Sequence, residues 1–390
     1  MVVVGDARAI PLADKSVQTC VTSPPYYGLR DYGVDGQIGS ENTLDAFLAT
    51  MVGVMREVRR VLRDDGTVWL NMGDSFASSA SAGDKQFGNP EFNENRPSRA
   101  ATKTPARTLN GFPPKCKMLV PHRLAIALCD DGWIVRQDIV WAKPSPMPES
   151  VTDRPTTAHE FVFLLAKQPR YYYDAEAIRE DAKPHNEGRM AAPKLGEHRL
   201  TTPYALQTRK QYAEIKGANK RSVWHIPSHP FPDAHFATFP PALVEPCILA
   251  GTPQKACPTC GAGWVRTFAD AGADRRHRAF EGGHKTAVGS RLGKTDWGGG
   301  YYERAHVPDG LASACDCPDN DGSGKALVLD PFAGSGTTGV VARQMGRAFF
   351  GVELNPEYAA MANARIREQG LGMTRATQAD GTVYEQQVMF

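Results

Sequence analysis

Hydrophobic positions predict an alternation of strands and helices that is clearest at the two ends of the chain. Near the N-terminus, the apolar runs 2–4 and 17–22 are typical of buried parallel strands, and apolar residues recur at helical spacing between Thr43 and Arg63. Asp65-Gly66 predicts a break after this helix. The further predicted elements are strands at 67–73, 159–167, 326–330 and 348–354, a helix and a strand within 119–144, and helices at 337–345 and 356–368. This alternation favours a mostly parallel α/β sheet with helices on both faces.

Length and composition are those of a globular protein. The 390 residues suffice for one large domain or two ordinary ones, and 41% hydrophobic with 23% charged residues is typical of soluble proteins. The N-terminal segment has no basic flank of a signal peptide, and no apolar run is long enough to span a membrane. We therefore expect a cytoplasmic protein without a membrane partner.

Positive charge is concentrated in two stretches, although the whole chain carries a formal net charge of only +2. Residues 85–123 hold eight Lys and Arg against two Glu, and residues 182–221 hold nine against three. Such stretches are either solvated loops or surfaces that contact phosphates. The candidate phosphate-contacting residues are Lys103, Arg107, Arg209, Lys210, Lys220 and Arg221.

A glycine-rich turn between a predicted strand and helix indicates a cofactor site. Gly334, Gly336 and Gly339 fit G-x-G-x-x-G, and Glu353 follows 19 residues after the first glycine, where an acidic residue takes ribose hydroxyls. This spacing suits a dinucleotide equally well. Asp330, directly before the turn, would repel a pyrophosphate but can hold an ammonium group, which favours S-adenosylmethionine.

A second motif, Ser-Pro-Pro-Tyr at 23–26, follows the predicted strand 17–22. Two prolines stiffen this loop at the carboxyl edge of the sheet, where α/β sites form. The Ser23 side chain and the Pro24 carbonyl are suited to accept hydrogen bonds from an amino group, and Tyr26 can stack on a base taken out of the duplex. Taken alone, the same four residues would favour an ordinary turn with a packed tyrosine.

Together, the two motifs resemble those of the DNA amino-methyltransferases, the cytosine-N4/adenine-N6 family. Having the Ser-Pro-Pro-Tyr motif first and the glycine-rich motif last resembles the circularly permuted β-type group. The resemblance continues through further blocks at 5–26, 60–74, 132–148, 153–167 and 235–252, which are spread over more than half of the length of the chain. It implies a Rossmann-like, circularly permuted S-adenosylmethionine-dependent methyltransferase sheet that acts on double-stranded DNA.

The resemblance also implies roles for individual residues. Ser23, Pro24, Pro25 and Tyr26 should hold the target base, and no covalent nucleophile is required. The residues implied in cofactor binding are Asp6 (near the adenine), Asp330, Phe332, Gly334, Gly336, Thr337 and Glu353. Adenine-specific members usually carry Asp at the position of Ser23, so we expect cytosine N4 to be the target, with adenine N6 as the alternative. Methylation of RNA or of a protein amide, and a non-catalytic DNA-binding role, are the remaining alternatives.

Four cysteines form two close pairs, Cys257 with Cys260 and Cys315 with Cys317. Two such pairs match the ligands of a closed, structural zinc site. The C-x-C form of the second pair and the 54 intervening residues leave four free thiols as the alternative. A disulfide is disfavoured in the cytoplasm.

The motifs imply a domain organisation in which insertions interrupt one methyltransferase domain. A cognate restriction endonuclease is a further expected partner, and the oligomeric state stays open. The expected parts are a catalytic half (1–180, with a basic loop at 76–117), a target-recognition region (181–225), a return to the methyltransferase domain (226–252), a cysteine-rich zinc-binding insertion (253–325), a cofactor-binding half (326–370) and a tail (371–390).

Overall fold

The computed structural model describes most of the chain, in two units. Unit 1 comprises Met1–Arg179, Asn219–Trp264 and Ser313–Phe390, and unit 2 comprises Glu180–Ala218 and Val265–Ala312. The described residues are 1–29, 34–77, 112–180, 218–228, 239–269, 307–370, 373–377 and 383–387.

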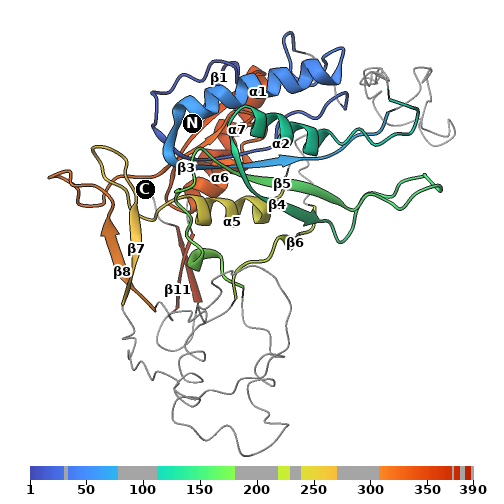
Figure 1. The fold of residues 1–390 in the computed structure, drawn as a ribbon. Helices are drawn as coiled ribbons and strands as arrows, with labels where there is room; N and C mark the ends of the chain where they lie inside the picture. Colours follow the sequence, from blue (N-terminus) through green and yellow to red (C-terminus); the bar gives the residue numbers. More distant parts are fainter. Residues whose placement is uncertain are drawn as a thin grey trace, which may run out of the picture. The chain divides into compact units, whose positions relative to one another are not determined.

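Unit 1 is built on an eight-stranded sheet with the order β1-β10-β9-β2-β3-β5-β4-β6 (Figure 1). Neighbouring strands are parallel except where β5 pairs with β3 and β4, which it meets antiparallel. The strands are β1 (Val2–Val4), β2 (Val17–Thr22), β3 (Leu62–Met72), β4 (Ile134–Ala142), β5 (His159–Ala166), β6 (Val223–His225), β9 (Leu327–Asp330) and β10 (Ala348–Glu353). The predicted, mostly parallel sheet is confirmed.

Helices cover both faces of this sheet, because alternate residues of its central strands enter two different cores. Leu329 and Leu70 belong to a core that α1 and α2 complete, whereas Val328 and Trp69 pack into a second core with α5, α6 and α7. The helices are α1 (Leu44–Val61), α2 (Val120–Asp130), α5 (Pro241–Gly251), α6 (Thr337–Gln344) and α7 (Pro356–Gln369), with a short 3₁₀ helix η2 (Glu176–Ile178). None of the helices in the described ranges is long and apolar enough to cross a membrane.

The predicted break at Asp65-Gly66 is wrong. Strand β3 begins at Leu62, immediately after α1, and continues through both residues. A Cβ on Gly66 would lie 2.7 Å from the Leu62 side chain and 2.9 Å from the Gln18 carbonyl oxygen. This glycine therefore permits close packing within the strand instead of ending an element.

Helix α5 and strand β6 had no clear signal in the hydrophobic pattern. Helix α5 contains Pro246 and is apolar on nearly every side, so its sequence lacks a helical period. Strand β6 has only three residues and alternates exposed, buried, exposed around Trp224. Two small two-stranded sheets complete the described strands: β7 (Trp264–Ala269) with β8 (Val307–Ser313), and the antiparallel pair of β11 (Met373–Thr377) with β12 (Val383–Gln387).

Candidate active site

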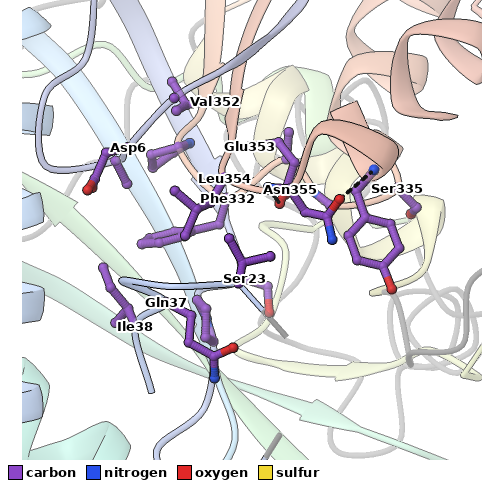
Figure 2. Close-up of a pocket in the computed structure, with 18 of the residues that line it drawn as sticks. Asp6, Ser23, Gln37, Ile38, Phe332, Ser335, Val352, Glu353, Leu354 and Asn355 are labelled. Carbon is purple, nitrogen blue, oxygen red and sulfur yellow. Dashed lines mark hydrogen bonds between the residues drawn. The ribbon is translucent and has the colours of Figure 1, made fainter. Parts of the chain in front are cut away.

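The two motifs that lie some 300 residues apart in the chain open into one pocket of unit 1 (Figure 2). Strands β2 and β9 are parallel neighbours, so the loops that follow their carboxyl ends emerge side by side. Of the predicted site residues, the pocket is lined by Asp6, Ser23, Pro25, Phe332, Gly334, Thr337 and Glu353. Pro24, Tyr26, Asp330 and Gly336 are not among the described lining residues.

The glycine-rich turn has the geometry that its sequence requires. Gly334 and Gly336 have φ values of +50° and +78°, which favour glycine, and α6 begins directly after Gly336. A Cβ on Gly339 would lie 2.4 Å from Ile366 of α7, so this third glycine allows α6 to pack closely against α7. The turn thus places backbone N–H groups and the start of a helix at the pocket.

Glu353 lies at the end of β10 and closes the pocket from the side of the glycine-rich turn. Its two carboxylate oxygens accept hydrogen bonds from the backbone N–H groups of Gly334 and Asn355, each at 2.9 Å. Burial raises the pKa of this carboxyl above its usual range. The remaining lone pairs of the carboxylate can accept hydrogen bonds from ligand hydroxyls.

Asp330 is the last residue of β9, directly before the glycine-rich turn, and its side chain stabilises this turn through hydrogen bonds. The side chain is fully buried, and it accepts hydrogen bonds from the hydroxyls of Thr22 and Thr338, both at 2.7 Å, and from the Phe332 N–H at 3.1 Å. Burial raises the pKa of Asp330 to about 6. These contacts tie the end of β9 to both β2 and α6, so Asp330 stabilises the turn that lines the pocket.

The raised pKa of Asp330 predicts a pH-dependent stability. Between about pH 4 and pH 6 the folded protein retains a proton that the unfolded chain releases, so the free energy of unfolding falls as the pH rises through this window. The free energy of unfolding of the wild type should fall by about 3 kcal/mol over this window, and Asp330→Asn should not show this fall. Urea unfolding of both proteins between pH 4 and pH 7.5 measures it. If the free energy of unfolding changed equally with pH in the wild type and in Asp330→Asn, the prediction would be contradicted. Asp319→Asn, which changes an exposed aspartate, is the control and should behave like the wild type.

Asp6 follows β1 and lines the same pocket as Glu353 (Figure 2). Its carboxylate pairs with the Arg8 guanidinium at 2.5 Å and also accepts the Arg8 backbone N–H at 2.8 Å. The hydrogen bonds from Arg8 lower the pKa of Asp6. Asp6 is therefore a fixed, negatively charged acceptor at the rim of the pocket.

Ser23 belongs to a hydrogen-bond network that continues away from the pocket. The Ser23 hydroxyl donates to Asn71 Oδ1 at 3.1 Å, and Asn71 Nδ2 donates to Glu160 Oε2 at 3.2 Å. The Tyr26 hydroxyl donates to the same Glu160 oxygen at 2.6 Å, while Lys143 forms an ion pair with Glu160 Oε1. Burial and the Glu160 carboxylate raise the pKa of Tyr26 well above its usual value, so this phenol keeps its proton.

Asn71, Glu160 and Lys143 were not predicted as site residues. They meet because β5 runs antiparallel to β3 and β4, which places the start of β5 beside the ends of its two neighbours. Each is a polar residue beside a short apolar run: Asn71 follows 68–70 in β3, Glu160 precedes 161–166 in β5, and Lys143 follows 139–142 at the end of β4. That local pattern was a usable signal, but only the strand order shows that the three share one edge.

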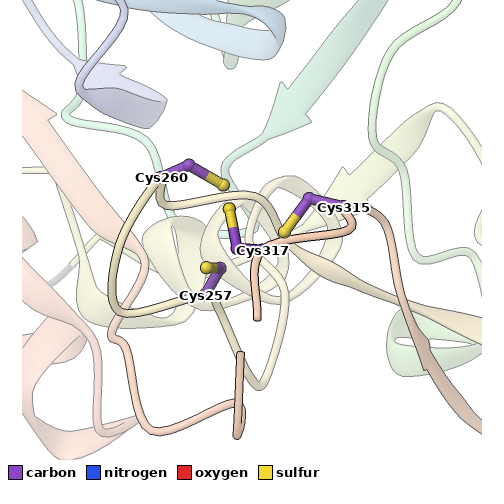
Figure 3. Close-up of side chains that lie close together, drawn as sticks. All are labelled: Cys257, Cys260, Cys315 and Cys317. Atoms are coloured by element: carbon purple, nitrogen blue, oxygen red, sulfur yellow. The ribbon is translucent and has the colours of Figure 1, made fainter. Parts of the chain in front are cut away.

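The four cysteines of the two predicted pairs come together in unit 1 (Figure 3). All four Sγ atoms lie within 4.8 Å of one another. Cys257 is buried, Cys260 is exposed, and Cys315 and Cys317 are half-buried. Four thiols that converge from two distant segments match the ligand set of a structural metal site.

The candidate phosphate-contacting residues fall mostly outside the described part of the chain. Lys103, Arg107, Arg209 and Lys210 belong to ranges that the structure does not describe. Lys220 lies over the Trp224 ring, with Nζ 5.1 Å from the centroid. The Arg221 carbonyl accepts a 2.7 Å hydrogen bond from the Trp224 indole. These two basic residues are thus held beside β6.

Comparison with known proteins places these observations in a family. The N6/N4 methyltransferase family model, described as DNA methylase, matches residues 17–257 and 320–364. The type II methyltransferase M.Cfr9I of Citrobacter freundii is 36% identical over 96% of this chain and 90% of its own length. M.SmaI of Serratia marcescens is 37% identical over 94% of this chain and 90% of its own length. Among solved structures, the cytosine-N4-specific PvuII DNA methyltransferase aligns with a TM-score of 0.49 and 15% identity, over 94% of this chain and 85% of that chain. The chain belongs to the N6/N4 DNA methylase family.

Proposed function

We propose that this protein transfers a methyl group from S-adenosylmethionine to the exocyclic N4 of a cytosine that is flipped out of double-stranded DNA. The observation that carries the proposal is the shared pocket, in which Ser23 faces the same space as Gly334 and Glu353. A cofactor seated on the glycine-rich turn would lie next to the residues suited to hold a base.

The charge of the pocket fits S-adenosylmethionine better than a dinucleotide. Two carboxylates, Asp6 and Glu353, line the pocket, and no Lys, Arg or His is among its described lining residues. A pyrophosphate would meet negative charge there, whereas the sulfonium and the ammonium of S-adenosylmethionine would be stabilised by it. Glu353 would accept the ribose hydroxyls, and Asp6 would lie near the adenine.

In this reaction, the protein has to make the amino nitrogen of the base nucleophilic enough to attack the methyl group. S-adenosylmethionine supplies an electrophilic methyl group, but the lone pair of the base amino group is delocalised into the ring. The Ser23 hydroxyl hydrogen is directed toward Asn71 Oδ1, which leaves the oxygen lone pairs available to accept an amino hydrogen. Accepting that hydrogen bond favours a tetrahedral, nucleophilic nitrogen.

Asn71, Glu160 and Lys143 would act as positioning residues in this mechanism. Asn71 Nδ2 donates to the Phe161 carbonyl as well as to Glu160, so its Oδ1 is turned toward Ser23. Lys143 holds the Glu160 carboxylate in place and offsets its charge. The network therefore fixes which way the Ser23 hydroxyl points before substrate arrives.

Tyr26 variants are expected to separate stacking from positioning. Stacking a base on an aromatic ring contributes about 1–3 kcal/mol, so Tyr26→Ala should lower single-turnover methyl transfer by about 5- to 150-fold. Tyr26→Phe keeps the ring but removes the hydroxyl that donates to Glu160. An intermediate rate in Tyr26→Phe would show that both roles contribute. Rates equal to the wild type in both variants would make this tyrosine purely structural.

The target base is tested by identifying the product. Ser23 occupies the position that usually carries Asp in adenine-specific members, which supports cytosine N4. DNA methylated by the purified protein should yield N4-methylcytosine on nucleoside mass spectrometry. N6-methyladenine would overturn the base assignment while keeping amino methylation, and the absence of both methylated nucleosides would overturn the proposed function.

The domain arrangement belongs to the same proposal. The base-binding motif follows β2 and the cofactor motif follows β9, the order of a circularly permuted methyltransferase. Residues 181–225 are proposed to recognise the DNA sequence, with the six basic candidates contacting phosphates. Because M.Cfr9I and M.SmaI are type II methyltransferases, a cognate restriction endonuclease is the proposed functional partner.

A further inference from the structure

The four-cysteine cluster lies far along the chain from the Ser-Pro-Pro-Tyr motif, but its second pair directly precedes the cofactor-binding half. We propose that Cys257, Cys260, Cys315 and Cys317 bind one structural zinc ion, and that this ion fixes the start of strand β9. The proposal concerns a metal and a strand, so it can fail without affecting the proposed methyl transfer.

The sulfur positions fit a single tetrahedral ion. Zn–S bonds of about 2.3 Å place the sulfurs of a tetrahedral site roughly 3.8 Å apart. The four Sγ atoms lie within 4.8 Å of one another and come from two separate loops (Figure 3). A set of four cysteines leaves no open coordination position, which indicates a structural ion.

The first cysteine pair has the tight turn typical of a zinc knuckle. The Gly261 N–H donates to the Cys257 carbonyl at 3.0 Å, and the Cys257 N–H donates to the Ala262 carbonyl at 2.8 Å. Gly261 has a φ of +70°, which allows the chain to reverse directly after Cys260. This turn presents both sulfurs toward the second pair.

The second pair leads directly into β9. Ten residues after Cys317 the strand begins at Leu327, and the intervening chain returns to the knuckle at Gly324. The Ala256 N–H donates to the Gly324 carbonyl at 3.1 Å. A Cβ on Gly324 would lie 2.7 Å from the Cys257 backbone, so the two segments are in close contact.

Gln18 joins the knuckle to the sheet. This buried residue of β2 donates from Nε2 to the Gly261 carbonyl at 2.8 Å, and its Oε1 accepts the Leu327 N–H. Arg63 of β3 donates to the Cys260 carbonyl at 2.9 Å. One buried amide therefore holds both the cysteine turn and the first residue of the strand that ends at Asp330.

Metal binding would therefore affect the order of β9, the strand that leads into the glycine-rich turn. Strand β9 has only four residues and lies between β2 and β10. Gln18 accepts the N–H of its first residue, and the Asp330 carboxylate at its end accepts hydrogen bonds from Thr22 and Thr338. Without the ion, the two cysteine segments would be joined only by hydrogen bonds such as that from the Ala256 N–H to the Gly324 carbonyl. Metal binding and local folding are coupled in such sites, so the start of β9 should loosen when the ion is removed.

The first test is the metal content of the full-length protein purified without chelator. Elemental analysis should give about one zinc per chain. Cys260→Ser should lose the metal, while the control Cys129→Ser, which changes an exposed cysteine outside the cluster, should retain it. Zinc near zero in the wild type, or one iron per chain in its place, overturns the site.

The second test measures the link to β9 by hydrogen exchange. Removing zinc with a chelator should abolish protection of the Leu327 amide, and restoring zinc should recover it. Gln18→Leu retains all four cysteines, so it should bind zinc but show the same loss at Leu327. Protection that is unchanged in the chelated wild type overturns the link from the metal to β9, and unchanged protection in zinc-loaded Gln18→Leu overturns the part assigned to Gln18.

Discussion

Ser23→Ala is expected to lower the rate of methyl transfer by about 10²–10³-fold, the effect of removing one oriented hydrogen-bonding group from a catalytic site. The substitution deletes the acceptor that activates the amino nitrogen. It leaves Asn71, Tyr26 and Glu160 bonded to one another. The affinity for S-adenosylmethionine should not change, because the proposed cofactor contacts lie on the glycine-rich turn and on Glu353.

Single-turnover kinetics at saturating cofactor, together with calorimetry of cofactor binding, separates these effects. Ser16→Ala is a matched control, because the Ser16 hydroxyl binds the Ala13 carbonyl and does not line the pocket. Asn71→Leu should reproduce part of the loss, since it removes the acceptor that orients the Ser23 hydroxyl. A wild-type rate in Ser23→Ala would show that this hydroxyl has no part in activating the base.

Glu353→Ala is expected to weaken the binding of S-adenosylmethionine by about 10- to 150-fold. A hydrogen bond to a charged group contributes about 1.5–3 kcal/mol, which corresponds to that range in Kd. Loss of the carboxylate also leaves the Gly334 and Asn355 N–H groups without their acceptor, so the turn that is proposed to bind the cofactor should become less ordered.

Isothermal titration calorimetry measures this prediction directly. Glu357→Ala is the control, because Glu357 is an exposed glutamate four residues further along the chain. Glu353→Gln keeps the size of the side chain and should fall between the wild type and Glu353→Ala. An unchanged Kd in Glu353→Ala would remove this residue from the cofactor site.

Local sequence was sufficient for elements whose chemistry is contained within a short segment. The turn from Gly334 to Gly339 requires glycine at particular positions, and it joins β9 to α6 as its sequence predicted. Apolar periodicity likewise located α1, which the structure shows at Leu44–Val61, within the predicted span. The failure at Asp65-Gly66 has a clear reason, because glycine also serves close packing, and only the neighbouring Leu62 and Gln18 reveal that use.

Asp330 illustrates a residue whose importance was visible in the sequence but whose role was not. Its position before the glycine-rich turn favoured a direct contact with a ligand ammonium. In the structure its carboxylate accepts hydrogen bonds from Thr22, Thr338 and the Phe332 N–H, and two of these partners come from other elements of the fold. Which hydroxyls surround a buried carboxylate depends on strand order, which hydrophobic periodicity does not encode.

The sequence by itself determined the two motifs, the strand and helix that flank the cofactor turn, and the pairing of cysteines at short spacing, because each depends on residues close together in the chain. Only the tertiary structure decided that Ser23 and Glu353 share a pocket, that antiparallel β5 brings Glu160 to Asn71, and that Gln18 connects the cysteine cluster to β9. These contacts join segments separated by up to about 330 residues. They depend on the order in which strands assemble, and that order is set by packing of the whole sheet.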